Sequence, residues 1–461
     1  MIDKSVLEKI TDDRFRLVCE QAVNDMNRLP IPGAVVGVSY EDRELVAAFG
    51  TTSVEHPLPV TEDTLFQIGS ITKTFVATAV MRLVEMGKLD LDKPVRTYLP
   101  HLKLMDETVA ARVTMRHLLT HTGGWVGDYF NDFGMGEDAL GTMVAKMADL
   151  EQLTPLGEIW SYNNSGFYLA GHVIEVVMGA SFETVIKELV LDPLGLKMSF
   201  FFAQDVITHR VAIGHEVVDK KPKVARPWAI GRAVHPAGGI VCTAGDLLRY
   251  ARFHMGDGTA SDGTRLLSQE SLALMQTPVL PATGISMIGL SWWIIPVGEA
   301  KIIGHGGGTN GQVSLLRIVP PNRFAVVVLT NSEEGDPLCW EAANLATKQY
   351  TGLTLPEAVP VELPEEKLSS YTGKYDSAES VCEITIREGG LVLQLTPKGG
   401  FPTPDSPPGQ APPPVRVALY AEDRLIVLDE PMKNSRGEFL RNPDKSIAWL
   451  RFGGRVHAPQ A

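Results

Sequence analysis

The sequence predicts an α+β fold in which an antiparallel sheet is flanked by helices, with an all-helical subdomain beside it and a small all-β domain after it. Strand-like runs occur at residues 34–50 and again at 291–330, and the stretch 70–275 between them is mostly helical. One sheet is therefore assembled from distant segments. Beyond residue 365 apolar and polar residues alternate with the period of strands, which predicts the second domain.

The N-terminal region begins with a predicted helix. We expect it over residues 5–28, because its apolar residues fall roughly on one stripe, and the prolines and glycine of residues 30–33 stop it. Two short strands follow at 34–40 and 45–50, joined by a polar turn.

The central region contains the clearest helix signals. A helix is expected over residues 71–86 and is closed by Gly87. Thr243 and Asp246 form a capping box in front of another helix. The remaining expected elements are strands at 291–296, 301–304, 312–319 and 324–330, and a helix at 340–350.

A change of composition divides the chain. Residues 354–365 are extended and proline-rich, as linkers are, which predicts one domain over 1–353 and another over 366–461. The second is expected to be a small β-barrel or sandwich, and its proline-rich stretch 397–414 is a loop that cannot join a sheet interior. Its strands are expected at 382–386, 391–395, 415–420, 424–428 and 446–452.

Composition excludes several classes of function. The 461 residues carry a formal charge of −13 without charge runs, which argues against nucleic acid as a partner. The N-terminus lacks the apolar core of a signal peptide and no window is long enough to span a bilayer, so we expect a cytoplasmic protein. The cysteines are expected to be scattered reduced thiols rather than disulfides or metal ligands: Cys19, Cys242, Cys339 and Cys382.

The sharpest chemical signal is Ser70 followed by Lys73. Residues three apart on a helix share a face, so the lysine amine can reach the serine hydroxyl and accept its proton. Gly69 ends a loop just before the helix, which leaves the amide of Ser70 free to face a developing oxyanion. Taken alone, the pattern fits a capping serine beside a solvated lysine better than it fits a catalytic pair.

Two further motifs change that balance. Tyr162 and Asn164 lie two apart in a polar loop; a phenol near cations can ionise more easily and move protons, and an amide can hold the lysine and a substrate carbonyl. The alternative is a buried aromatic residue beside a helix cap. His305 begins a glycine run where the strand 301–304 is expected to end; it offers a hydrogen-bond donor to a carboxylate or carbonyl, although a glycine-rich turn explains the run too.

Together, in this order and at these separations, the three motifs resemble those of the penicillin-recognising serine hydrolases. That family includes class C β-lactamases, D-alanyl-D-alanine carboxypeptidases, D-aminopeptidases and β-lactamase-like esterases. The stretches 115–124 and 236–246 are similar as well, so the resemblance covers about residues 20–350. The family pattern S-x-x-K, Y-x-N and K/H-x-G matches Ser70/Lys73, Tyr162/Asn164 and His305/Gly307.

The resemblance implies a β-lactamase/transpeptidase-like domain that works through an acyl-enzyme without a cofactor. It implies Ser70, Lys73 and Tyr162 as the catalytic residues, Asn164, His305 and Gly307 as substrate-binding residues, and the backbone amides of Ser70 and Gly308 as the oxyanion hole.

Two departures from the family shape the expected activity. His305 stands where cell-wall enzymes and most β-lactamases have lysine, and no leader is seen. A peptidase or amidase acting on short peptides, perhaps with D-residues, is therefore expected first, and a carboxylesterase or acyltransferase acting on small esters second. β-Lactamase activity ranks below both, and a non-catalytic ligand sensor or assembly protein is the alternative from another class.

The second domain, with Tyr371 to Tyr375 near its start, is similar to the lipocalin-like barrels appended to some cytoplasmic D-aminopeptidases. In those relatives the barrel borders the cleft and assists oligomerisation. The resemblance therefore allows a homo-oligomer for this chain, and the loop 397–414 is expected to approach the cleft. His117 and His121 are expected to be structural rather than metal ligands, since no third ligand accompanies them. Trp292 and Trp293 are expected in the sheet core rather than in a carbohydrate platform.

Overall fold

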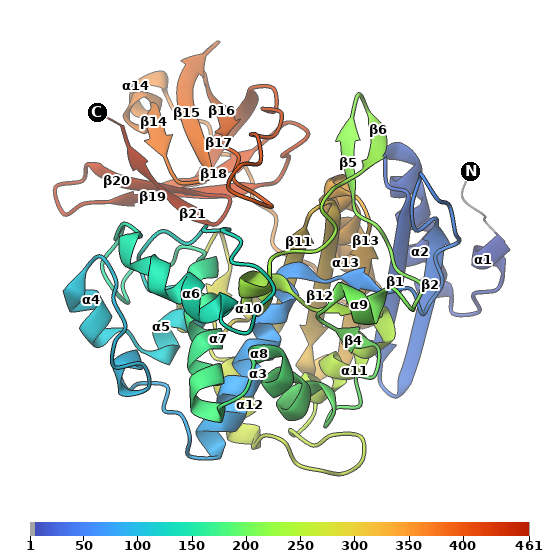
Figure 1. The fold of residues 1–461 in the computed structure, drawn as a ribbon. Helices are drawn as coiled ribbons and strands as arrows, with labels where there is room; N and C mark the ends of the chain where they lie inside the picture. Colours follow the sequence, from blue (N-terminus) through green and yellow to red (C-terminus); the bar gives the residue numbers. More distant parts are fainter. Residues whose placement is uncertain (1–4, 461) are drawn as a thin grey trace.

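The structure is a computed structural model that describes residues 5–460, with a sheet-and-helix part followed by a barrel (Figure 1). Eight strands form the main sheet in the order β2-β1-β13-β12-β11-β10-β9-β8, and every pair is antiparallel. The predicted assembly from distant segments is confirmed. Its strands are β1 (Gly33–Tyr40), β2 (Arg43–Gly50), β8 (Leu280–Pro281), β9 (Met287–Ile288), β10 (Trp293–Val297), β11 (Ala300–Thr309), β12 (Gln312–Val319) and β13 (Phe324–Thr330).

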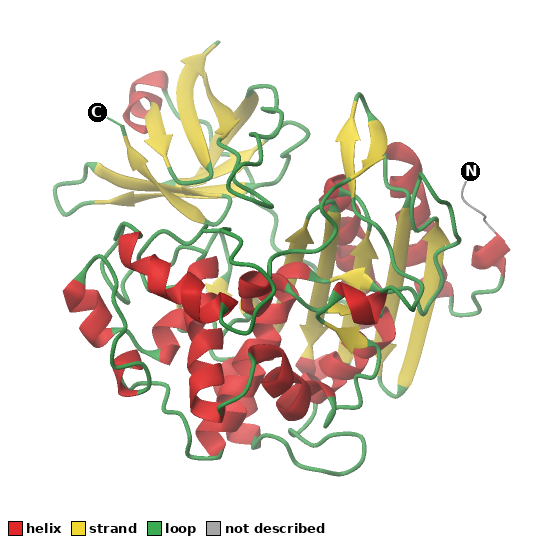
Figure 2. Cartoon of the chain, viewed as in Figure 1, coloured by secondary structure: helices red, strands yellow, loops and turns green. Residues whose placement is uncertain are grey.

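Helices cover both faces of this sheet (Figure 2). On one face α2 (Asp13–Arg28) and α13 (Asp336–Thr351) pack against alternate strand residues such as Val36. On the other, Val35 joins the larger core that contains α3 (Thr72–Glu85), α7 (Asn164–Met178) and α11 (Ala244–Met255). The strict alternation of Val35 and Val36 between two cores is what a strand buried on both faces requires.

Most of the other helices belong to the region between the two halves of the sheet. They are α4 (Glu107–Arg112), α5 (Met115–Leu119), α6 (Ala139–Lys146), α8 (Phe182–Ile186), α9 (Ala203–Val206), α10 (His235–Gly238) and α12 (Gln269–Met275), with α1 (Ser5–Glu8) at the N-terminal end. Short strands in the same region form a three-stranded sheet and a hairpin: β3 (Phe66–Gln67), β7 (Val241–Cys242) and β4 (Ser199–Phe200), and β5 (His215–Val218) with β6 (Lys221–Val224).

Two sequence predictions need correction here. The helix expected over 5–28 is two helices, because the carboxylate of Asp12 accepts from the amides of Arg14 and Phe15 and starts a new helix at residue 13. The strand expected to end at Gly304 continues to Thr309, because the glycine run pairs with β12 as regular strand. The run is therefore neither a turn nor a strand end.

The last part of the chain is a closed eight-stranded antiparallel barrel, as predicted for its fold class. Five strands match the predicted runs, whereas β14, β19 and β21 were not predicted, since they are short or rich in charged residues. The helix α14 (Glu365–Leu368) precedes β14 (Gly373–Asp376), β15 (Ser380–Arg387), β16 (Gly390–Pro397), β17 (Val415–Ala421), β18 (Arg424–Val427), β19 (Arg436–Arg441), β20 (Ile447–Phe452) and β21 (Arg455–Pro459).

In residues 5–460 no single helix is both long enough and apolar enough to cross a membrane, although the bent pair Asn164–Met178 and Phe182–Leu191 meets the length and composition requirements.

Candidate active site

Ser70 lies where a loop becomes a helix, as expected. It is the middle residue of a short 3₁₀ turn, Gly69–Ile71, that runs directly into α3. Gly69 has a φ of +50°, and a side chain there would place its Cβ 2.7 Å from the nitrogen of Gly308 on β11. A glycine is therefore required at position 69, because without a side chain the loop that carries Ser70 can contact the backbone of the glycine run on β11.

The Lys73 amine is held beside the serine hydroxyl. Its Nζ lies 3.0 Å from Oγ of Ser70 and donates to the carbonyl of Ala237 at 2.6 Å. The side chain is fully buried, and this burial, helped by the positive charge of Arg455 and opposed by Asp128, holds the pKa of Lys73 well below its ordinary value of 10.5. A neutral amine next to a hydroxyl can accept its proton.

Tyr162 packs against the same lysine. Nζ of Lys73 is 4.9 Å from the centre of the phenol ring, and the phenol is nearly buried. Burial raises the pKa of Tyr162, and this outweighs the hydrogen bond with Ser70 and the charge of Arg455, which lower it. The expectation of an easily ionised phenol is therefore corrected: the group keeps its proton and can act as a proton donor.

Asn164 begins α7, but its partner differs from the expected one. Its side-chain amide donates to Asp128 at 2.8 Å, and among the hydrogen bonds of residues 5–460 none joins it to Lys73. The neighbouring Asn163 fixes this helix start, since its side chain accepts from the amide of Gly166 at 2.6 Å and donates to the carbonyl of Trp125 at 2.8 Å.

His305 is buried on β11 and faces the same centre. Its ring lies 6.2 Å from that of Tyr162, and burial, assisted by the charge of Lys73, lowers its pKa to about 3. Nδ1 is hydrogen-bonded to the carbonyl of Gly306, so Nδ1 is the protonated nitrogen and Nε2 is a bare, buried acceptor. The imidazole is thus neutral and offers a lone pair, not the donor expected from the sequence.

Two of the three glycines after His305, Gly307 and Gly308, lie against the loop that carries Ser70. A side chain on Gly307 would place its Cβ 1.9 Å from the carbonyl oxygen of Ile68, two residues before Ser70. Gly308 is exposed, and its backbone contacts Gly69. The backbone of β11 therefore lies directly against the loop that carries Ser70. The structure brings six of the seven residues predicted for the site together directly, and the seventh, Asn164, is connected to them through Asp128.

The other residues singled out from the sequence make packing and capping contacts in the structure. His121 stacks on Tyr162 at 4.4 Å and accepts from the amide of Asn163 at 2.9 Å, while His117 completes a capping box with Thr114. Within residues 5–460 no cluster of His, Cys, Asp or Glu suits a metal ion, and the four cysteines are free and buried. Trp292 is fully buried, as expected for the sheet core.

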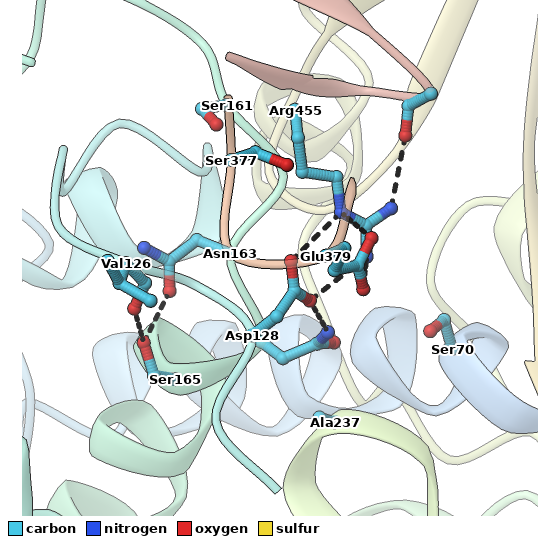
Figure 3. Close-up of polar contacts among 12 residues, drawn as sticks. Ser70, Val126, Asp128, Ser161, Asn163, Ser165, Ala237, Ser377, Glu379 and Arg455 are labelled. Carbon is cyan, nitrogen blue, oxygen red and sulfur yellow. Dashed lines mark hydrogen bonds and ion pairs between the residues drawn. The ribbon is translucent and has the colours of Figure 1, made fainter. Parts of the chain in front are cut away.

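Three functional candidates escaped the sequence reasoning: Asp128, Glu379 and Arg455. The guanidinium of Arg455 faces Asp128 and Glu379, with Ser70 on the neighbouring helix (Figure 3). Two of the three come from barrel segments that follow no recognisable motif. The loop 397–414, which was expected to approach the cleft, places the ring of Phe401 against that of Phe130, with the ring centres 5.0 Å apart.

Comparison with known proteins gives the family and the fold of the chain. The β-lactamase family model matches residues 20–348. The chain is 33% identical to penicillin-binding protein 4 of Amycolatopsis lactamdurans over 78% of this chain and 94% of that protein. Among solved structures, SurE aligns with a TM-score of 0.76 at 28% identity, covering 97% of this chain and 99% of its own. An octameric penicillin-binding protein homologue from Pyrococcus abyssi aligns with a TM-score of 0.63 at 26% identity, covering 96% and 99%.

The fold and the match over residues 20–348 define a serine hydrolase of the β-lactamase and penicillin-binding protein type. The chain belongs to the β-lactamase family and carries an additional C-terminal barrel.

Proposed function

We propose that the protein hydrolyses small amide substrates through an acyl-enzyme on Ser70. The observation that carries the proposal is the buried amine of Lys73 at 3.0 Å from the serine hydroxyl, where burial lowers the pKa of the amine. A serine without a base is a poor nucleophile, and this contact supplies the base.

The proposed reaction has two steps. Lys73 takes the proton of Ser70 while Oγ attacks the substrate carbonyl, and the backbone amides of Ser70 and Gly308 stabilise the oxyanion. Tyr162 gives its proton to the leaving nitrogen and regains one from Lys73, so the bond between carbonyl and nitrogen breaks and the amine departs. Water then attacks the ester carbonyl and gives a proton to Lys73. The bond between the carbonyl carbon and Oγ breaks, Oγ takes that proton back, and the acid leaves with Ser70 restored.

For the substrate we propose short peptides or amides, including those with D-residues. A solved structure of SurE contains D-Leu, and that protein aligns with 97% of this chain at 26% identity. A close second is an esterase or acyltransferase acting on small esters. The neutral His305 favours substrates that place no carboxylate beside it, because it supplies no positive charge there.

A panel of substrates tests this proposal. D-Aminoacyl anilides, L-peptides, p-nitrophenyl esters and nitrocefin should be compared with the wild-type protein and with Ser70→Ala. We expect the highest kcat/KM on an anilide and no turnover by the variant. Full activity of Ser70→Ala on every substrate would overturn the mechanism, and exclusive activity on esters would move the second function to first place.

We also propose a homo-oligomer and a division into residues 1–353, 354–365 and 366–461. The octameric homologue supports the first, and the extended stretch without regular structure between α13 and α14 supports the second. Light scattering coupled to size exclusion measures the mass, and a mass of 50.2 kDa would contradict the oligomer.

A further inference from the structure

A charged cluster of Arg455, Asp128 and Glu379 lies between the barrel and the candidate active site. Nη2 of Arg455 donates to Asp128 at 3.0 Å and to Glu379 at 3.1 Å, and Nε donates to the other oxygen of Asp128 at 3.1 Å. Arg455 is the first residue of β21 and follows Gly453 and Gly454; these three residues are called the barrel turn below. The barrel therefore inserts one guanidinium into the other part of the chain.

The barrel turn contacts two of the residues that the motifs single out. The carbonyl of Gly454 accepts from the amide of Tyr162 at 2.8 Å, and the guanidinium of Arg455 lies 4.8 Å from the centre of the Tyr162 ring. Asp128, which Arg455 holds, accepts from the side chain of Asn164 at 2.8 Å. Arg455 thus contacts Tyr162 directly and is connected to Asn164 through Asp128.

The same guanidinium acts on the lysine through space. After burial, the charge of Arg455 is the largest influence that lowers the pKa of Lys73, and Asp128 opposes it. Removal of Arg455 alone therefore raises the pKa of Lys73, because the opposing carboxylate stays. The titratable and charged groups that face Lys73 are Tyr162, His121, His305, Arg455 and Asp128.

A different arginine, Arg451, attaches the barrel to the rest of the chain. Arg451 on β20 donates to the carbonyl of Trp160 at 3.1 Å, is almost fully buried, and pairs with Glu438 of the barrel. Its guanidinium has no carboxylate partner outside the barrel among the described residues. Arg455 differs from Arg451, because its contacts connect it to Tyr162 and Asn164 of the candidate active site and not only to the surface on which the barrel docks.

We propose that Arg455 is a positioning residue for the acylation of Ser70: through the barrel turn and Asp128 it fixes Tyr162 and Asn164, and it keeps a positive charge beside Lys73. This inference rests on the proposed function. The barrel is then a working part of the active site, and a chain without the barrel lacks a complete site. Arg455 itself forms no bond with the reacting atoms.

The test measures the rate at which Ser70 is labelled by an uncharged phosphonate ester, followed by intact mass from pH 5 to 10. Arg455→Gln is expected to lower the labelling rate about a hundredfold, as a displaced catalytic group does, and to move its acid limb to higher pH. Arg455→Lys keeps the charge and should leave the acid limb in place while the rate stays reduced. The matched control is Arg441→Gln, which removes another barrel arginine paired with an aspartate, Asp423 at 2.8 Å, away from the site.

Each outcome decides a different question. A folded Arg455→Gln with the labelling rate and acid limb of the wild type overturns the inference and leaves the proposed function standing. An unchanged pH profile with a rate loss equal to that of Arg441→Gln assigns Arg455 a structural role and overturns the inference as well. Absence of labelling at Ser70 in the wild type overturns both the proposed function and the inference.

Discussion

The two sides of the candidate active site are built in different ways. On the side of the main sheet, backbone contact and burial hold the groups: Gly69 meets Gly308, Gly307 lies against Ile68, and Lys73 is fully buried. On the side of the barrel, ion pairs hold the groups in place. The side chains of Arg455 and Glu379 are 24% and 39% exposed, and ion pairs rather than an apolar contact join them.

The two sides should respond differently to substitution. A close-packed interior tolerates little extra volume, whereas an ion pair at the edge of solvent is weakened by salt and by removal of one charge. Volume changes should therefore damage the sheet side and charge changes the barrel side.

The largest effect is expected from Ser70→Ala. The variant removes the nucleophile without adding volume, so kcat/KM should fall by at least about ten thousandfold while the thermal unfolding midpoint stays unchanged. Steady-state kinetics on the best substrate of the panel measures the loss. A residual activity within tenfold of the wild type would mean that another residue is acylated.

Lys73→Met should follow, with a loss of about a thousandfold. Methionine fills the same space without the amine, and general-base catalysis contributes roughly a hundred- to ten-thousandfold. The variant should unfold at the same temperature or higher, because no polar amine is then buried. Retained labelling of Ser70 at the wild-type rate would contradict the role of the lysine.

Glu183→Gln tests how α10 is held in place. This helix carries the Ala237 carbonyl, which accepts a hydrogen bond from the Lys73 amine. Burial alone would raise the pKa of Glu183, but hydrogen bonds from His235 and Arg232 outweigh it and lower the pKa to about 2. The wild type therefore gains stability above about pH 4.5 and loses it as the pH falls towards 2. We expect Glu183→Gln to cost up to about 3 kcal/mol at pH 7 and to have a flatter acid profile in urea unfolding. Equal slopes for both proteins would contradict this.

Gly307→Ala should have the smallest effect, about 2 kcal/mol of unfolding free energy, because its Cβ meets the carbonyl of Ile68 at 1.9 Å and the backbone must shift. The matched control is Gly306→Ala, whose Cβ meets no atom closer than 3.8 Å. Urea unfolding of both variants measures the difference. Equal stabilities would mean that the sheet side is less tightly packed than described.

The sequence predicted the sheet side of the site and missed the barrel side, for a physical reason. Ser70 and Lys73 are three residues apart on one helix, so their contact follows from local geometry. The contact of Arg455 with Asp128 joins residues separated by 327 positions, and nothing in the local sequence of either residue indicates the other. His305 shows a third case: its position was expected, but its protonated nitrogen depends on a backbone carbonyl that only the folded strand provides.

The fold shows the same division. Long periodic segments such as α3 and β13 were predicted within a few residues, because their apolar pattern is strong. The short strands β14 and β21 were missed, since four or five residues are too few to show a period. The helix break at Asp12 was missed because a capping aspartate inside an amphipathic stripe changes no apolar position.

The most direct test of the account is the pH dependence of Ser70 acylation in the wild type, with an uncharged phosphonate ester and intact-mass detection. Burial holds the pKa of Lys73 well below 10.5, so the amine loses its proton at a lower pH than a free lysine does, and the rate should reach its plateau well below pH 10.5. A rate that keeps rising through pH 10 would show that the lysine is charged under working conditions, which contradicts its role as the base.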